Sequence, residues 1–326
     1  MKRSQFQPRN PDGSRRNFLR AAGTLPAMVA ALSKEGAAQQ QKQTLPQVKW
    51  GKNSISRMIC GSNPFGGLSH LSAMINYEFR QYFTPETIVK MLHKCEAEGI
   101  NGCQGLRPDL YKKFTDEGGK IQVFSNGQGD PARIDTLVKS GCIGIHHFGV
   151  TTDVLYKQGK LDTAREYLKR VRDTGLLVGL CSHIPEVIDK AESQGWDVDY
   201  YMTCVYQWGR TKEELEKMFG DHKELLPVET YAMIAREGYS EVFLNGDPAR
   251  MYKVIRQVKK PCLAYKILAA GRKAENPKVI EQAFKEAFEN IKPTDAIIVG
   301  MYDRYIDQVA ENAEYTRRFG AVASTS

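Results

Sequence analysis

Residues 177–205 read LVGLCSHIPEVIDKAESQGWDVDYYMTCV and contain three successive structural signals. Leu177–Cys181 is a short apolar run typical of a strand, and Tyr200–Val205 is a second one. Between them, Pro185 opens a helix that ends near Gly195. Strands that alternate with helices in this way pack as neighbouring parallel strands. This stretch therefore predicts an α/β fold built on a parallel sheet.

The same alternation runs through most of the 326 residues. Eight short apolar runs are predicted as strands: Ile55–Cys60, Gly99–Cys103, Ile121–Ser125, Cys142–His147, Leu177–Cys181, Tyr200–Val205, Cys262–Ile267 and Ala296–Val299. Eight parallel strands are what a closed (β/α)8 barrel requires. We expect one TIM-barrel domain over residues 48–319, with a flexible tail at 320–326.

The first residues carry a different signal. Residues 14–20, SRRNFLR, resemble the twin-arginine export motif, and a mildly apolar stretch and the small residues Gly36-Ala37-Ala38 follow. We expect a signal peptide over residues 1–38, a linker over 39–47, recognition by the twin-arginine translocation machinery and a periplasmic protein. Because this route carries folded cargo, it favours a protein that binds its cofactor before export.

Charge and cysteine content limit the classes of function. The formal net charge is +8, but residues 1–38 contribute seven basic and two acidic residues to it. The remainder is close to neutral, which gives no indication of nucleic-acid binding. No run of 18 apolar residues predicts a permanent membrane span. The seven cysteines are widely spaced in apolar runs, so we interpret them as small buried side chains.

Polar residues cluster where the predicted strands end. In a (β/α)8 barrel these carboxyl ends meet at one mouth, where active sites are built. His147, His183 and Lys266 are the candidates with reactive side chains. His146 and His147 are adjacent, so strand alternation allows only one of them to face the mouth, and we expect His147 there. No spacing of metal ligands accompanies these histidines, and we predict no metal site.

Residues 208–246 interrupt the alternation. The segment is long for a connection between a strand and a helix, and it includes a charged helical stretch at Lys212–Met218 and a proline at position 227. We expect an elaborated loop at the mouth of the barrel. A purely structural excursion remains the alternative interpretation.

Three segments resemble the aldo/keto reductases, in the order in which that family has them. Residues 55–67, ISRMICGSNPFGG, resemble the first strand and turn, and residues 178–187, VGLCSHIPEV, resemble the fifth strand and its helix. Residues 298–301, IVGM, with the polar residues downstream, resemble the cofactor motif of the eighth strand. The resemblance implies a barrel that binds NADP(H) and transfers hydride to a carbonyl or sugar-type substrate.

The catalytic quartet that the resemblance implies is incomplete. Gln104 stands at the aspartate position, Asn126 at the lysine position, and His147 at the histidine position. The tyrosine position falls at Asp109, so Tyr111 is the candidate proton donor, and Lys266 lies on another strand. The residues that the resemblance places at the cofactor are Leu268, Ala269, Gly271, Arg272, Gly300, Met301, Arg304, Gln308 and Asn312.

Three hypotheses follow from these residues. The first is an exported NADP(H)-dependent oxidoreductase with a non-standard proton donor. The second is a barrel without redox chemistry, a lyase or isomerase that uses Lys266 or the pair His147 and His183. The third is a noncatalytic barrel that holds a small-molecule ligand.

Overall fold

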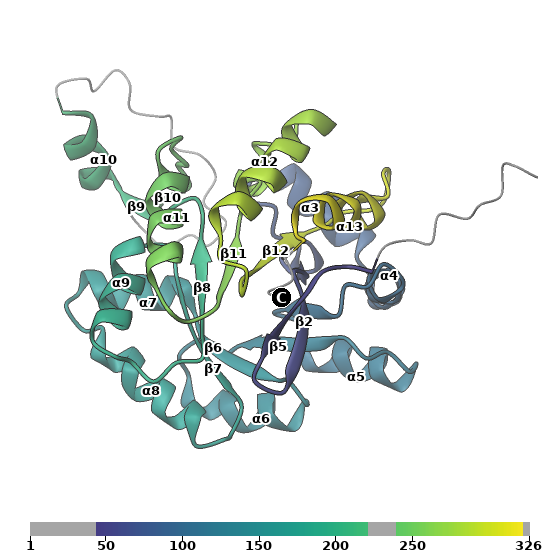
Figure 1. Cartoon of the computed structure of the whole chain (residues 1–326), viewed down its shortest axis with the longest axis horizontal. Coiled ribbons are helices and arrows are strands. Elements are labelled where there is room, and N and C mark those ends of the chain that lie inside the picture. The colour runs from purple at the N-terminus through teal and green to yellow at the C-terminus, as the bar shows by residue number, and fades with distance from the viewer. Residues whose placement is uncertain (1–43, 221–238, 322–326) are drawn as a thin grey trace, which may run out of the picture. The chain divides into compact units, whose positions relative to one another are not determined.

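The computed structural model describes residues 44–220 and 239–321, and the predicted signal peptide lies outside them. Eight parallel strands form a closed barrel in the order β11-β12-β3-β4-β5-β6-β7-β8 (Figure 1). The strands are β3 Met58–Gly61, β4 Gly102–Gln104, β5 Gln122–Asn126, β6 Gly144–His147, β7 Leu177–Ser182, β8 Tyr200–Cys204, β11 Cys262–Tyr265 and β12 Ala296–Gly300. The predicted (β/α)8 barrel is confirmed.

Helices follow the strands and cover the outside of the ring (Figure 1). Several begin where the sequence predicts, because a capping side chain precedes a proline. The Thr84 hydroxyl accepts a hydrogen bond from the Thr87 amide at 3.3 Å. The helices are α3 Ala73–Tyr82, α4 Pro85–Ala97, α5 Pro108–Asp116, α6 Ile134–Lys139, α7 Gly149–Lys157, α8 Asp162–Arg172, α9 Pro185–Ser193, α10 Lys212–Phe219, α11 Asp247–Gln257, α12 Pro277–Asn290 and α13 Gln308–Phe319.

The first predicted strand is two strands in the structure. Residues 55–60 divide at Arg57, which separates β2 (Asn53–Ser56) from β3. Arg57 is buried, and its guanidinium donates hydrogen bonds to the backbone carbonyls of Asp295, Gly320 and Lys292. An arginine that binds the loop between α12 and β12 and the end of α13 therefore marks the corner where the chain enters the barrel.

An antiparallel hairpin closes the amino-terminal end of the barrel. It pairs β1 (Gln47–Trp50) with β2, and the Trp50 ring lies 5.8 Å from the Phe124 ring and 5.6 Å from the Tyr200 ring. The Trp50 indole N–H donates to the carbonyl of Thr294, just before β12. Apolar side chains of the described residues therefore fill this end of the barrel and leave the carboxyl ends of the strands as the place for a ligand.

Strand alternation decides which side chains enter the barrel. In β6, Gly144 and His146 face the interior, while Ile145 packs in the outer core against the helices. His146 lies within 3.4 Å of the Tyr200 hydroxyl. His147 is therefore on the outward face, contrary to the expectation that it faces the mouth.

The segment between β8 and α11 is the elaborated loop that the sequence predicts, as far as it is described. Strand β9 (Arg210–Thr211) pairs with β10 (Tyr239–Ser240), and α10 begins with a capping box formed by Thr211 and Glu214. Residues 221–238 lie outside the described structure. Arg210 forms a buried ion pair with Asp247 at the start of α11, which anchors the segment.

Two other expectations concern the cysteines and the membrane. All seven cysteines lie in the described part of the chain, and each is a buried free thiol, as predicted. Within residues 44–220 and 239–321, we find no helix with both the length and the apolar character needed to cross a bilayer.

Candidate active site

A cavity of about 800 Å³ opens at the carboxyl ends of the barrel strands. Its floor includes the inward-facing Cys181, Met202 and Ile298, and its walls come from the loops after the strands and from α3 and α13. This volume falls in the range of small-molecule binding sites. The mouth of the barrel is therefore the candidate active site.

Lys266 lies on the wall of this cavity, directly after β11. Its backbone is left-handed, with φ of 61°. Its Nζ is buried and has no hydrogen-bond partner among the described residues, and it lies 5.4 Å from the centre of the Phe243 ring. Burial is the main cause that lowers the pKa of Lys266, with Glu241 opposing and Arg272 adding to the effect. The cavity wall thus holds an amine that lacks a counter-ion in contact.

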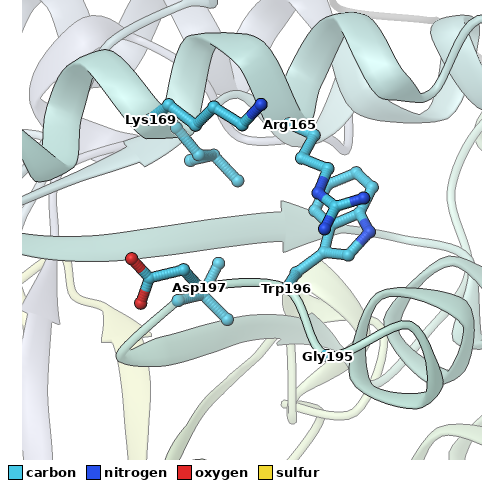
Figure 2. Close-up of a pocket in the computed structure, with 7 residues that line it drawn as sticks. Arg165, Lys169, Gly195, Trp196 and Asp197 are labelled. Carbon is cyan, nitrogen blue, oxygen red and sulfur yellow. The ribbon is translucent and has the colours of Figure 1, made fainter.

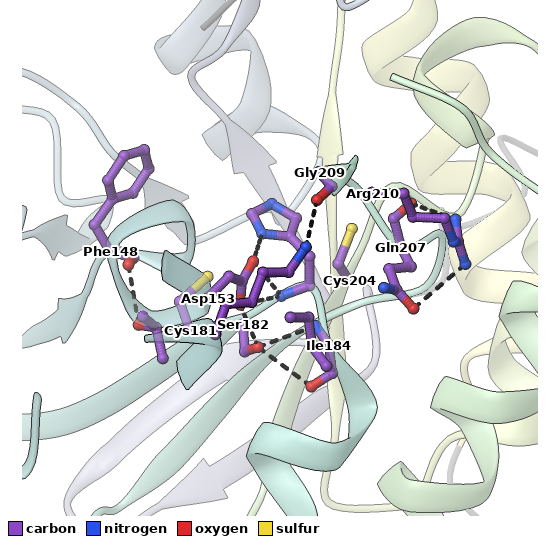
Figure 3. A network of polar contacts seen from close by, with 12 residues as sticks. Phe148, Asp153, Cys181, Ser182, Ile184, Cys204, Gln207, Gly209 and Arg210 are labelled. Atoms are coloured by element: carbon purple, nitrogen blue, oxygen red, sulfur yellow. Dashed lines mark hydrogen bonds and ion pairs between the residues drawn. The ribbon is translucent and has the colours of Figure 1, made fainter. Parts of the chain in front are cut away.

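A histidine–aspartate pair lies on the same cavity. His183 lines it just after β7, and Asp153 on α7 accepts a hydrogen bond from His183 Nδ1 at 2.7 Å. The Asp153 carboxylate also accepts from the Ser182 hydroxyl at 2.6 Å, as Figure 3 shows at the end of β7. His183 Nε2 forms no hydrogen bond within residues 44–220 and 239–321. This arrangement fixes the ring and leaves one nitrogen to accept a proton.

A second pair joins His70, which lines the cavity, to Glu241. His70 Nδ1 lies 2.8 Å from a Glu241 carboxylate oxygen, and Asn63 Nδ2 donates to His70 Nε2 at 3.3 Å. Burial lowers the pKa of His70 to about 4, and Lys266 and His183 contribute while Glu241 opposes. His70, His183 and Lys266 all line this cavity, so these groups share one site.

The sequence prediction missed His70 and Glu241. They lie 171 positions apart, and neither ends a predicted strand. Glu241 belongs to the long segment after β8 and contacts the cavity residue His70. The one sequence signal that could have pointed to Glu241 is its position as an acidic residue directly before the apolar Val242 and Phe243.

Strained backbone also concentrates around this cavity. In the described chain, five residues other than glycine have positive φ, and four of them line the cavity: His70, Gln128, Lys266 and Ala270. Such conformations cost about 1–3 kcal/mol each and cluster at functional sites. Their position supports a functional assignment for the mouth.

Gln104 and Asn126, two predicted catalytic residues, end β4 and β5 and line the cavity. Gln104 Nε2 lies 3.3 Å from Nε2 of His146, which is the histidine that faces inward. Burial lowers the pKa of His146 to about 3, so its ring is neutral at pH 7. These three positions together form a neutral cluster without an ionised group.

His147 and Tyr111 do not line the cavity. His147 Nδ1 lies 2.7 Å from the Thr152 hydroxyl, and its ring packs 5.3 Å from the Tyr167 ring on the helix side of the strand. Burial lowers the pKa of His147 to about 4. Tyr111 is on α5, with its ring near Gly141 before β6. The structure therefore separates both residues from Lys266 and the mouth.

The predicted cofactor residues divide in a similar way. Those that line the cavity are Leu268, Gly271, Gly300, Met301, Gln308 and Asn312. Ala269, Arg272 and Arg304 are not part of the lining. Arg272 donates to the carbonyls of His70 and Ala269, and Arg304 donates to the Glu78 carboxylate at 2.6 Å.

These contacts bear on whether NADP(H) fits the groove between the β11 and β12 loops. The shape fits, because small and apolar residues line a groove that continues from the mouth. The charge fits less well, because Glu311 belongs to the lining, Arg304 is already paired with the lining acid Glu78, and Arg272 donates to backbone carbonyls. A phosphorylated dinucleotide needs cations or free amides at this position.

A second cavity, of about 100 Å³, lies between α8 and the segment before β8 (Figure 2). The Arg165 guanidinium lies 5.8 Å from the centre of the Trp196 ring, and Asp197 pairs with Arg172. Residues 195–198 precede β8, so this cavity lies away from the carboxyl-end mouth. Its size and its lining make it a packing defect of the surface and no candidate for catalysis.

Comparisons with known proteins give the fold context. No family model matches the sequence, and no curated protein matches it. Among solved structures, a glycerol dehydrogenase from Gluconobacter oxydans is 12% identical, with a TM-score of 0.48 over 84% of this chain and 94% of that one. A truncated 3-deoxy-D-arabino-heptulosonate 7-phosphate synthase from Thermotoga maritima is 9% identical, with a TM-score of 0.45 over 85% and 91%.

An N-acetylmannosamine-6-phosphate 2-epimerase from Clostridium perfringens is 11% identical, with a TM-score of 0.40 over 81% of this chain and 90% of that one. Sequence identities and TM-scores this low do not indicate which reaction this chain catalyses. The assignment of the fold rests on the strand pairing of this chain, and the assignment of the site rests on its cavity.

Proposed function

We propose that this protein is an enzyme that moves a proton next to a carbonyl group in a small sugar-type substrate, as an isomerase or a lyase does. One observation carries the proposal: a buried amine without a hydrogen-bond partner among the described residues, Lys266, shares a cavity with the His183–Asp153 pair. Amines and imidazoles in such surroundings are the groups that perform acid–base chemistry in enzymes.

His183 is the proposed base. With Nδ1–H bound to Asp153, its neutral ring presents Nε2 to the cavity, and that nitrogen removes a proton from the carbon next to the carbonyl. Asp153 keeps the ring in one orientation and stabilises the positive charge that develops on it. The hydrogen bond from Ser182 and the backbone N–H of His183 hold Asp153 in turn.

Lys266 is the proposed electrophilic partner. When the carbon loses its proton, negative charge develops on the carbonyl oxygen, and a nearby cation stabilises it. Because Nζ has no acceptor among the described residues, a bound substrate oxygen supplies the missing partner. The lowered pKa of Lys266 also favours transfer of its proton to that oxygen, which yields the enol.

Carbonyl reduction by NADP(H) is the second candidate function. The groove beside Gly300 and Met301 favours it, since its position matches the one that the aldo/keto reductase resemblance implies. Two features weigh against it. Gln104, Asn126 and His146 lack the charge needed to activate a tyrosine. Glu311 lines the groove, and the nearby Arg304 is already paired with Glu78. Proton transfer without a nicotinamide therefore explains more of the site.

Deuterium exchange distinguishes the two candidates. The protein is incubated in D₂O with a panel of aldoses, ketoses and sugar acids, without added nicotinamide, and hydrogen loss is followed by proton NMR. Wild type is expected to exchange the hydrogen next to the carbonyl in at least one compound, and Lys266→Met and His183→Gln to lose the exchange. His93→Gln, on α4 outside the cavity lining, is the matched control. Turnover of the panel only with NADPH supports the reductase instead.

A further inference from the structure

The cavity wall opposite Lys266 carries a second positive charge, that of Arg133. In the barrel order, β11 and β5 are separated by β12, β3 and β4 on one side and by β8, β7 and β6 on the other. Lys266 follows β11, and Asn126 ends β5, so the two residues lie across the mouth from one another. The short 3₁₀ helix η2 (Pro131–Arg133) belongs to the β5 side, and Arg133 lines the cavity there.

Arg133 lacks a charged partner within the described part of the chain. It is half-buried, and although its backbone N–H donates to the Asp130 carbonyl, its guanidinium forms no ion pair and no hydrogen bond with any residue of 44–220 or 239–321. Asp130, three positions earlier, caps η2 through the Ala132 amide. Arg107 also lines the cavity, but it is exposed and pairs with Asp109. Arg133 is therefore a cation of the cavity lining whose guanidinium has no charged partner among the described residues.

Asn126, on the same side of the cavity as Arg133, offers a hydrogen-bond donor as well. Asn126 Oδ1 accepts a hydrogen bond from the Gln128 amide at 2.8 Å, so its Nδ2 is left to donate toward the cavity that the residue lines. The acids of the lining, Glu78 and Glu311, belong to α3 and α13, which follow β3 and β12. On the β5 side, the cavity lining thus offers the hydrogen-bond donors of Arg133 and Asn126, and such donors favour binding of an anion.

We infer that Arg133, with Asn126, binds an anionic group of the substrate, a carboxylate or a phosphate, while the carbonyl end lies at Lys266 and His183. The inference rests on the proposed function for the position of the carbonyl. Because the two ends lie across the mouth, the substrate has several carbons between its carbonyl and its anion. A sugar acid or a sugar phosphate meets this requirement, and a short 2-oxo acid does not.

Calorimetric titration with three probes tests the inference: gluconate, glucose 6-phosphate and uncharged glucose, at a fixed ionic strength. Wild type is expected to bind at least one anion about tenfold or more tightly than glucose, as a charge-assisted contact contributes. Arg133→Met is expected to abolish that preference, and Arg133→Lys to keep part of it. Arg165→Met, on α8 outside the lining of this cavity, is the matched control and is expected to behave as wild type.

The two anions distinguish a carboxylate from a phosphate as the preferred group. Equal affinity for all three probes in a wild type that is folded by circular dichroism overturns the inference, and so does a preference that survives in Arg133→Met. Lys266→Met keeps the anion preference, because Lys266 acts at the other end. The two proposals can therefore fail separately. Anion binding that depends on Arg133, without any deuterium exchange, supports the anion site and contradicts the proposed function. Deuterium exchange without a preference for anions supports the proposed function and contradicts the anion site.

Discussion

His183 Nδ1 and Asp153 Oδ2 lie 2.7 Å apart, and their side chains are 8% and 7% exposed. His183 follows β7 and Asp153 belongs to α7, so two successive units of the barrel contribute to one buried pair. The carboxylate also accepts the Ser182 hydroxyl. This fixed orientation of the ring is the basis for assigning His183 as the base.

Asp153→Asn tests that orientation. An amide keeps the shape but does not stabilise a charged imidazole, so we expect proton exchange to slow by about 10²–10⁴-fold, close to the effect of His183→Gln. Ser182→Ala removes one contact of the carboxylate and is expected to have a smaller effect. Initial exchange rates by NMR are the measurement, and an Asp153→Asn variant with the wild-type rate removes Asp153 from the mechanism.

Lys266→Met is expected to stabilise the fold while it abolishes activity. The substitution removes a buried cation without a partner, which is worth about 1–3 kcal/mol in the free energy of unfolding. Because the folded pKa of Lys266 is lowered, the folded state binds fewer protons than the unfolded state up to about pH 10.4, and its stability rises with pH in that window. The gain from Lys266→Met is thus greatest at neutral or lower pH. Urea unfolding at pH 7 and pH 9.5 measures it, and a destabilised variant at pH 7 contradicts the assignment of a strained amine.

Buried neutral histidines predict loss of stability in acid. The folded pKa is about 4 for His70 and His147 and about 3 for His146, against about 6.5 in the unfolded chain. The unfolded state therefore binds more protons as pH falls below 6.5, and each group contributes a slope of up to about 1.4 kcal/mol per pH unit. His147→Asn is expected to reduce the slope between pH 6.5 and 4.5 by one such contribution. Chemical denaturation across this range gives the slopes, and identical slopes for variant and wild type count against a buried neutral His147.

The Arg210–Asp247 pair predicts a large effect on stability. Both side chains are almost fully buried, and Arg210 also donates to the carbonyls of Gln207 and Val242. Asp247→Asn leaves a buried charge uncompensated, so we expect a loss of about 3–5 kcal/mol in the free energy of unfolding. Arg304→Met, which breaks an exposed pair, is expected to cost less than about 1 kcal/mol. Similar losses for the two variants contradict the buried character of the first pair.

The barrel itself was predictable because its signals are local. Apolar runs, capping residues and prolines recur along the chain, and each of the eight predicted strands corresponds to a barrel strand. The hairpin formed by β1 and β2 was not predicted, since Trp50 finds its partners Phe124 and Tyr200 only in the folded barrel. The split at Arg57 has the same origin, because its three carbonyl partners lie more than 230 positions away.

The site was predictable only in part. Lys266 and His183 were found as polar residues at strand ends, and both line the cavity. The choice of His147 over His146 required the direction of alternation in β6, which the register with β5 and β7 decides. His70 and Glu241 meet through the segment after β8, and no local pattern connects them. Arg133 was not considered, because it follows a strand by seven positions.

The most direct measurement of the central claim is a crystal structure of the protein with a carbonyl compound that it exchanges in D₂O. We predict that the carbonyl oxygen lies within hydrogen-bond distance of Lys266 Nζ and that the adjacent carbon faces His183 Nε2. A compound bound with its carbonyl away from both residues, or bound outside the mouth of the barrel, contradicts the account.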